Sequence, residues 1–227
     1  GNQAKEQGGG IYNLESDSVI DECTFENNST ENDDGGGVYN KNSGSTFTKC
    51  TFTGNSTKDD GGGIYNFESD TEIAECIFKD NSASEQGGGL YNENSNPTLS
   101  KCTFNGNTAK DDGGGIYNSG SHPPITGCIF QNNSASDRGG GLFNNGSHPI
   151  LTTCSLEKNS ADGWGGGIYN NNSNSEMIDC VFKDNLTRNS GAGVRNYDGN
   201  PTFTVCKFLG NLAGVEGGGI SNYYSRP

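Results

Sequence analysis

A Gly-rich block of six residues recurs nine times along this chain and constrains its fold more than any other feature. The block first reads Gly-Gly-Gly-Ile-Tyr-Asn; the first step to the next block is 27 residues and every later step is 26. The blocks occupy 8–13, 35–40, 61–66, 87–92, 113–118, 139–144, 165–170, 191–196 and 217–222. A fixed period of this length is typical of a solenoid, in which each repeat forms one coil and stacks on its neighbours.

A second motif, Cys-x-Phe-x-x-Asn, repeats with the same period between the Gly-rich blocks, with Leu156 replacing phenylalanine in one copy. Its cysteines are Cys23, Cys50, Cys76, Cys102, Cys128, Cys154, Cys180 and Cys206. Each repeat therefore consists of the Gly-rich block, a polar spacer, an apolar residue three positions before the cysteine, the cysteine motif and an acidic turn.

The composition is unusual for a compact globule, because only 29% of the residues are hydrophobic and the net charge is −14. Disorder is a possible consequence of such values, but disordered chains have no reason to hold apolar residues at a fixed phase. The acidic balance disfavours nucleic acid and anionic lipid as partners. No stretch resembles a signal peptide or a membrane span, so we expect no direct membrane insertion.

The fourth position of the Gly-rich block is apolar in every repeat, and the block alternates between two faces as a β-strand does. Ile20, Cys23 and Phe25 predict a second strand with an apolar face. With two or three short strands per coil, we predict an all-β, right-handed parallel β-helix of about eight coils of 26 residues, roughly 40 Å long. We interpret 1–227 as a single β-helix domain and as a piece of a longer array.

Stacking in register gives each repeated position a file of identical side chains. Asn13, Asn40 and Asn66 are expected to form a buried ladder of amides that bond one another. The cysteines are expected to form a buried file of free thiols in the core, because a rung spacing of about 4.8 Å exceeds the Cβ separation of a disulfide. Disulfides between rungs and a metal bound by thiolates are the alternatives.

The pairing of Gly-Gly-x-Ile with Phe-x-x-Asn, from Gly8 to Asn222, resembles the repeat of the polymorphic outer-membrane proteins, surface autotransporters built on a right-handed β-helix. This chain differs from that repeat in a third glycine where alanine is usual. The resemblance implies an extracellular or surface-displayed protein, often adhesive, and identifies no ligand.

The fifth position of the Gly-rich block is aromatic in seven consecutive repeats and is expected to face outward. An exposed aromatic strip of this kind could contact a glycan or a protein on a host or neighbouring cell. Its alternative role is structural stacking beneath the polar spacer. The residues are Tyr12, Tyr39, Tyr65, Tyr91, Tyr117, Phe143 and Tyr169.

The acidic turns place carboxylates of successive repeats above one another, beside a second file that includes Asp34 and Asp60. Calcium between coils would relieve their mutual repulsion, because carboxylates and turn carbonyls suit that ion. The alternative is a solvated acidic face that needs no cofactor. The residues considered as calcium ligands are Asp33, Asp59, Glu85, Asp111 and Asp137.

Uniform spacer lengths leave no coil that differs enough to build a catalytic cleft, and the sequence contains no nucleophile–histidine–acid set. We therefore expect a protein that is not an enzyme. Two hypotheses remain: an adhesin or binding module at the cell surface or secreted, and a structural stalk that holds other domains away from a cell. The sequence identifies no catalytic residue.

Overall fold

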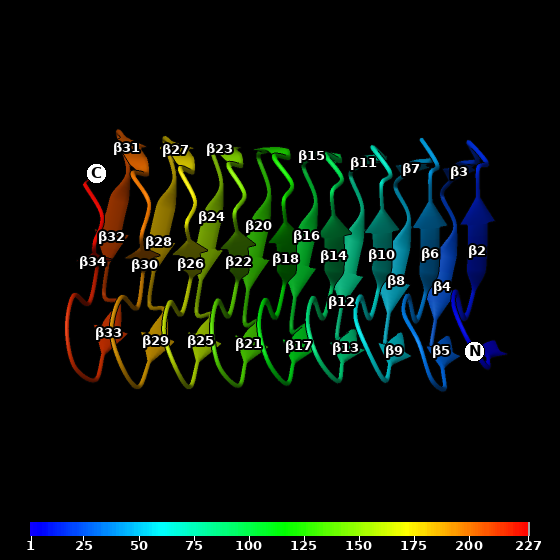
Figure 1. Ribbon diagram of the computed structural model, residues 1–227, viewed down its shortest axis with the longest axis horizontal. Helices are drawn as coiled ribbons and strands as arrows, with labels where there is room; N and C mark the ends of the chain where they lie inside the picture. The colour runs from blue at the N-terminus through cyan, green and yellow to red at the C-terminus, as the bar shows by residue number, and fades with distance from the viewer. Residues whose placement is uncertain (227) are drawn as a thin grey trace.

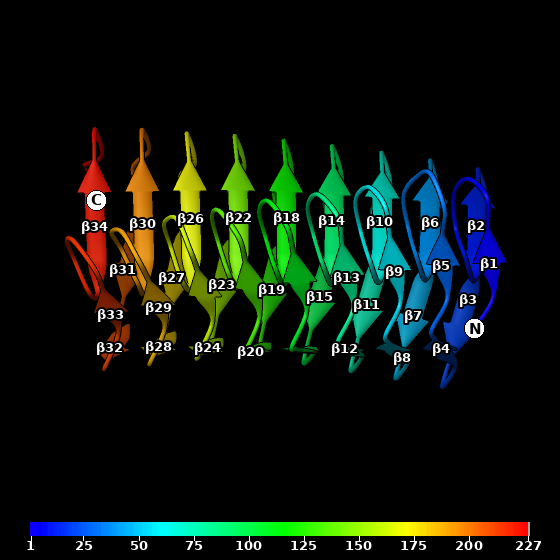
Figure 2. The same ribbon diagram turned by 90° about the horizontal axis from the view of Figure 1, so that it is seen from below.

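The computed structural model describes residues 1–226, which form a rod of stacked coils with the two termini at opposite ends (Figure 1). The described residues contain 34 β-strands in four parallel sheets that run along the rod (Figure 2). This architecture confirms the predicted all-β parallel β-helix. No helix in residues 1–226 has the length and hydropathy that a membrane crossing would require.

Each sheet receives one strand from each coil, and each strand pairs with its equivalents in the coils before and after it. Sheet A has nine strands: β1 (Gln3–Ala4), β5 (Ser29–Thr30), β9 (Ser56–Thr57), β13 (Ser82–Ala83), β17 (Thr108–Ala109), β21 (Ser134–Ala135), β25 (Ser160–Ala161), β29 (Leu186–Thr187) and β33 (Leu212–Ala213). Sheet B has nine strands from the Gly-rich blocks: β2 (Ile11–Leu14), β6 (Val38–Lys41), β10 (Ile64–Phe67), β14 (Leu90–Glu93), β18 (Ile116–Ser119), β22 (Leu142–Asn145), β26 (Ile168–Asn171), β30 (Val194–Tyr197) and β34 (Ile220–Tyr223).

The other two sheets come from the residues just before and just after each cysteine. Sheet C has eight strands: β3 (Val19–Asp21), β7 (Thr46–Thr48), β11 (Glu72–Ala74), β15 (Thr98–Ser100), β19 (Pro124–Thr126), β23 (Ile150–Thr152), β27 (Glu176–Ile178) and β31 (Thr202–Thr204). Sheet D has eight strands: β4 (Thr24–Glu26), β8 (Thr51–Thr53), β12 (Ile77–Lys79), β16 (Thr103–Asn105), β20 (Ile129–Gln131), β24 (Ser155–Glu157), β28 (Val181–Lys183) and β32 (Lys207–Leu209).

A coil therefore contains four short strands, not the two or three predicted. The predicted strand through Ile20, Cys23 and Phe25 is divided because Glu22 adopts a positive φ of 51°. A residue in the left-handed region cannot continue a strand, so the chain turns a corner there and enters a different sheet. The equivalent Lys49 has a φ of 50°, so the corner recurs.

The Gly-rich block is the second kind of corner. Gly35 has a φ of 70°, which favours glycine. A Cβ on Gly36 would lie 2.6 Å from the carbonyl oxygen of Gly62 in the next coil, so the rise of one coil leaves no room for a side chain. Stacking at the normal strand spacing therefore favours glycine at the block's second position as well as its first, although the eighth block carries Ala192 there and β30 still pairs with β26 in register.

The core is a set of continuous files that run along the rod axis. The paired strands keep equivalent residues opposite one another, as in Ile64 opposite Leu90 and Phe78 opposite Phe104. The rings of Phe78 and Phe104 stack with centroids 4.5 Å apart and an interplanar angle of 4°. Because every coil adds the same few apolar side chains, a chain with a small hydrophobic fraction still acquires a continuous core.

The amide ladder predicted for the sixth position of the block is also present. The Nδ2 atom of Asn13 donates to Oδ1 of Asn40 at 2.9 Å, and Asn40 donates in turn to Asn66 at 2.8 Å. A second ladder includes Asn28, which accepts from Nδ2 of Asn2 at 3.0 Å and whose own Nδ2 donates to Oδ1 of Asn55 at 2.9 Å. These bonds satisfy polar groups inside the rod, where an unpaired amide would be costly.

Candidate functional site

The aromatic residues of the Gly-rich blocks form a stacked file, but this file is not an exposed strip. Tyr12, in the first coil, is 47% exposed, whereas Tyr39 is only 4% exposed. The prediction of an outward-facing surface is therefore wrong for the six residues that follow Tyr12. The buried members are Tyr39, Tyr65, Tyr91, Tyr117, Phe143 and Tyr169.

The physical reason is that other parts of the coils cover the aromatic file on the outer face of sheet B. The hydroxyl of Tyr65 donates to Oε2 of Glu93 at 2.6 Å, and the burial that surrounds Tyr117 raises its pKa to about 12. Burial is the main cause that raises the pKa of Tyr39 and of Tyr91. The carboxylates that directly precede two Gly-rich blocks add to this effect: Asp34 raises the pKa of Tyr39 further, and Asp60 raises that of Tyr91. The file is a second small core, separate from the central one.

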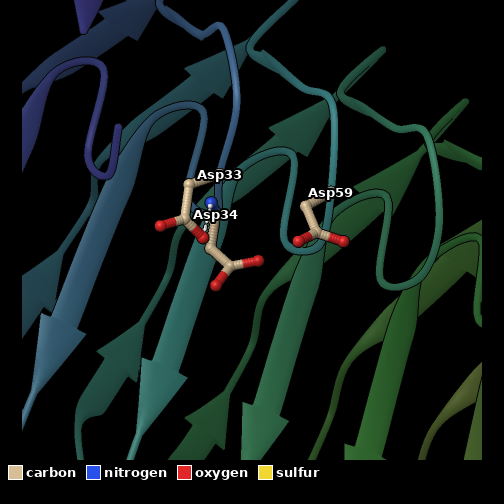
Figure 3. A group of neighbouring side chains, drawn as sticks. All are labelled: Asp33, Asp34 and Asp59. Atoms are coloured by element: carbon tan, nitrogen blue, oxygen red, sulfur yellow. Dashed lines mark hydrogen bonds between the residues drawn. The ribbon is translucent and has the colours of Figure 1, made fainter. Parts of the chain in front are cut away.

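The acidic turns do bring carboxylates together. Oxygen atoms of Asp33, Asp34 and Asp59 lie within 4.8 Å of one another (Figure 3), and Asp59, Asp60 and Glu85 form a second such group. Both groups join side chains from two adjacent coils. The donor types suit a hard cation such as calcium, so these residues are the ones that could hold it.

Two of the five residues considered as calcium ligands, Asp111 and Asp137, belong to neither of these groups within residues 1–226. Asp111 is exposed, and Oδ2 of Asp137 lies 3.2 Å from Nε of Arg138. The acidic file extends along the sequence to Asp137 and lapses at Gly163, Asn189 and Val215, whereas its close carboxylate groups, among the residues that the structure describes, lie in the N-terminal coils.

The carboxylates directly before the Gly-rich blocks accept hydrogen bonds from the backbone of the next coil. Oδ1 of Asp34 accepts from the amide of Asp60 at 3.1 Å, and Oδ1 of Asp60 accepts from the amide of Gln86 at 2.8 Å. Burial nevertheless raises the pKa of Asp34 to about 8 and that of Asp60 to about 7. These groups are therefore partly protonated near neutral pH, which reduces the charge available to a cation.

The cysteines lie at the corner between sheets C and D, and all eight are free. Cys23 is exposed in the first coil, Cys206 is half-buried, and the six between them are buried. The thiol of Cys76 lies 3.4 Å from the carbonyl oxygen of Phe47 and 3.3 Å from that of Ala74. Each internal thiol is therefore packed and hydrogen-bonded, and burial raises the pKa of Cys50 to about 11.

Between β26 and β30 two repeated positions depart from their usual residues, and the side chains there line a pocket of about 210 Å³. Arg195 replaces the tyrosine of the aromatic file, while Arg138 and Trp164 occupy the position directly before the Gly-rich block, which is aspartate in three other repeats. The pocket is lined by Asp137, Arg138, Trp164, Tyr169, Arg195 and Tyr197.

The sequence shows that the aromatic run ends after Tyr169, where Arg195 takes its place in the next block, but it does not reveal the pocket. The available signal was that Trp164, the only tryptophan of the chain, stands in a file otherwise dominated by polar residues. Of the residues predicted to contact a ligand, Tyr169 lines the pocket. Trp164 and Arg195 come together only because their two coils stack. The distance between them along the sequence does not reveal this arrangement.

These features define the class: a parallel β-helix repeat protein with coils of 26 residues joined by internal ladders. The family model described as "Right handed beta helix region" matches residues 1–130 and 107–227, and the chain belongs to that family. Its handedness agrees with the prediction. No curated protein and no solved structure matches the chain.

Proposed function

We propose that this chain is a non-enzymatic repeat domain that acts as a rigid spacer at an extracellular or cell surface. The observation that carries the proposal is the continuity of its files: aromatic rings, amides and apolar side chains pass from coil to coil along the rod. Each coil is fixed to the next by four parallel strand pairings, so bending at one coil would break several files together.

The buried aromatic file favours the spacer over the adhesin hypothesis. The adhesin hypothesis depended on an exposed surface formed by Tyr39 and the equivalent aromatic residues of later coils. These rings are buried and stack on one another along the rod. Stacked rings about 5 Å apart contribute to stability beyond the area they bury. The aromatic file thus supports a mechanical role for most of the chain.

Assignment to a surface is part of the proposal and depends on two sequence features. One is the resemblance of the Gly-Gly-x-Ile and Phe-x-x-Asn pair to the polymorphic outer-membrane protein repeat. The other is the net charge of −14, which keeps an extended protein soluble and separated from other anionic molecules. We propose no catalytic role, because the β-helix fold alone confers no activity.

One observation favours a second candidate function, that of a binding module. The pocket between β26 and β30 interrupts the aromatic file, and its exposed rings are placed at the surface of an otherwise regular rod. A spacer and a binding module are compatible in one chain, since the pocket occupies only a small part of the length.

The spacer function predicts that whole coils can be removed without loss of folding. Deletion of residues 61–112 joins Asp60 to Gly113, preserves the repeat phase and should shorten the rod by two strand spacings, about 10 Å. Small-angle X-ray scattering of the wild-type and shortened chains measures this change. Deletion of residues 61–99 is the matched control, because it breaks the phase and should prevent folding.

The rigid-spacer proposal is contradicted by a pair of results: deletion of the two coils abolishes a cell-surface function, and insertion of a flexible linker of equal reach restores that function. In that case reach matters and rigidity does not. Saturable binding of the intact chain to cells or to a glycan array would support the binding module, with or without the spacer function.

A further inference from the structure

We propose that the pocket between β26 and β30 binds a terminal sugar that carries a carboxylate, with the carboxylate on Arg195 and one face of the sugar ring on Trp164 and Tyr197. This inference goes beyond the spacer function and does not depend on it. It follows from an unpaired buried cation, two accessible aromatic rings and the size of the pocket.

The cation is Arg195, whose side chain is 9% exposed yet lines the pocket. Its Nε atom is buried and has no hydrogen-bond partner in the described part of the chain. Its Nη1 atom donates to Oγ of Ser221, and its guanidinium carbon lies 5.3 Å from the centroid of the Tyr223 ring. Within residues 1–226, Arg195 forms no ion pair.

Arg138, the other arginine of the pocket, is already neutralised. Its Nη2 lies 2.7 Å from Oδ2 of Asp112, and its Nε lies 3.2 Å from Oδ2 of Asp137. The guanidinium of Arg138 also lies 4.9 Å from the centroid of the Phe143 ring. An incoming anion would therefore gain more from Arg195, because a buried charge without a partner is costly and a carboxylate offsets that cost through a charge-assisted hydrogen bond.

The apolar side of the pocket suits a sugar ring. Trp164 and Tyr197 are each 37% exposed, although both are large aromatic residues. Aromatic faces pack against the C–H face of a pyranose ring, while the carboxylate of Asp137 can accept hydrogen bonds from ring hydroxyls. The combination of a cation, an acceptor and two rings matches an acidic sugar better than a simple inorganic anion.

The pocket's size and the charge of the rod favour the terminal sugar of a glycan over an extended acidic polysaccharide. A volume of about 210 Å³ is smaller than the roughly 300 Å³ at which pockets for drug-sized ligands begin, so it fits one ring. A rod of net charge −14 repels an extended polyanion. A single acidic unit at the end of a neutral glycan avoids that repulsion and still reaches Arg195.

Trp164 makes the test direct, because it is the only tryptophan of the chain and its fluorescence reports on this pocket alone. The intact chain is titrated with N-acetylneuraminic acid and with glucuronic acid, and separately with the neutral sugars N-acetylmannosamine and glucose. We expect a saturable change in Trp164 fluorescence with at least one acidic sugar and none with the neutral sugars. Acetate and benzoate distinguish a sugar site from a general carboxylate site.

Two variants of Arg195 separate binding from folding. Arg195→Tyr restores the aromatic residue that other coils carry, and Arg195→Gln removes the charge with a smaller change in shape. Both should keep the circular dichroism spectrum and weaken binding of the acidic sugar at least about tenfold, because one charge-assisted hydrogen bond is lost. Lys183→Gln, an exposed position in β28, is the control for removal of one positive charge and should bind as the wild type does.

The proposal is overturned by any of four results, of which three concern the wild-type chain. The first is a Trp164 signal that no acidic sugar changes at millimolar concentration. The second is equal binding of neutral and acidic sugars, and the third is equal binding by acetate or benzoate. Binding that survives in a folded Arg195→Gln chain would likewise remove Arg195 from the site.

Discussion

Asn81 and Asn107 are joined by two hydrogen bonds across adjacent coils, although 26 residues separate them in the chain. Nδ2 of Asn81 donates to Oδ1 of Asn107 at 2.9 Å, and the backbone amide of Asn81 donates to the same oxygen at 3.1 Å. Nδ2 of Asn107 then donates to the carbonyl oxygen of Phe78 at 3.0 Å and to Oδ1 of Asn133 at 2.9 Å. One side chain thus connects three coils.

Asn107→Ala should lower the free energy of unfolding by about 2–4 kcal/mol, because it leaves the amide of Asn81 and the carbonyl of Phe78 buried without partners. Urea denaturation followed by circular dichroism measures the loss. Asn32→Ala, at an exposed position, is the matched control and should change stability little. Equal stability of the two variants would show that the ladder does not hold the coils together.

The ladder was predictable from the sequence, whereas the burial of the aromatic file was not. A fixed period with an apolar or amide residue at a fixed phase requires that residues such as Asn81 and Asn107 lie above one another. Alternation along a strand shows only that Tyr65 points to the face opposite Ile64. It does not show that a side chain of the next coil, such as Glu93 against Tyr65, covers that face, because this contact depends on how the coils stack.

The number of strands per coil was missed for a related reason. Glu22 and Lys49 occupy the left-handed region without being glycine or asparagine, so their residue types give no sign of a corner. The pocket was missed because it depends on a break in two files at once. Trp164 and Arg195 are each visible as an irregularity, but only the stacking of their coils places them around one cavity.

Acidification from about pH 8 to about pH 5 should raise the melting temperature of the rod by several degrees. Burial raises the pKa of Asp34 to about 8 and that of Asp60 to about 7, so the folded state binds more protons than the unfolded state over this window. Stability therefore falls as the pH rises through it. Differential scanning calorimetry at constant ionic strength measures the dependence.

The double substitution Asp34→Asn with Asp60→Asn should flatten this pH dependence, because asparagine keeps the oxygen that accepts from the next coil and removes the titration. Asp17→Asn, an exposed carboxylate in the first coil, should leave it unchanged. A melting temperature that falls steadily between pH 8 and pH 5 in the wild type would contradict the assignment.

Alkaline titration tests the buried aromatic file. Burial raises the pKa of Tyr39, Tyr65 and Tyr91 above the usual range and that of Tyr117 to about 12. The buried tyrosines of the file should therefore add little tyrosinate absorbance in the folded rod as the pH passes 10, and their absorbance should appear sharply when the rod unfolds. Because the unfolded tyrosines ionise near their ordinary pKa, stability should fall above about pH 10.

Ionisation of most tyrosines below pH 11 in a chain that is still folded would mean that the file is exposed, as the sequence first suggested. Tyr91→Phe provides the control, since it removes one buried member of the aromatic file and should reduce only the absorbance that appears on unfolding.

Calcium should not be required for folding, because the carboxylates of Asp34 and Asp60 already accept hydrogen bonds from backbone amides of the adjacent coil. We expect the melting temperature in millimolar calcium and in millimolar chelator to differ by less than about 2 °C, close to the effect of a very weak ligand. A larger rise in calcium that disappears in Asp33→Asn with Asp59→Asn would place a cation between the first coils.

Thiol reactivity should divide the eight cysteines by their place in the rod. Cys23 is exposed and should react rapidly with a thiol reagent such as 5,5′-dithiobis(2-nitrobenzoate), whereas Cys206 is half-buried and should react slowly. The six internal cysteines should react only after denaturation, because they are covered and burial favours the neutral thiol, as the raised pKa of Cys50 illustrates. Cys23→Ser removes the fast phase and serves as the control. Rapid reaction of several thiols in the folded wild type, or fewer than eight reactive thiols after denaturation without reductant, would show that the internal cysteines are accessible or are joined as disulfides.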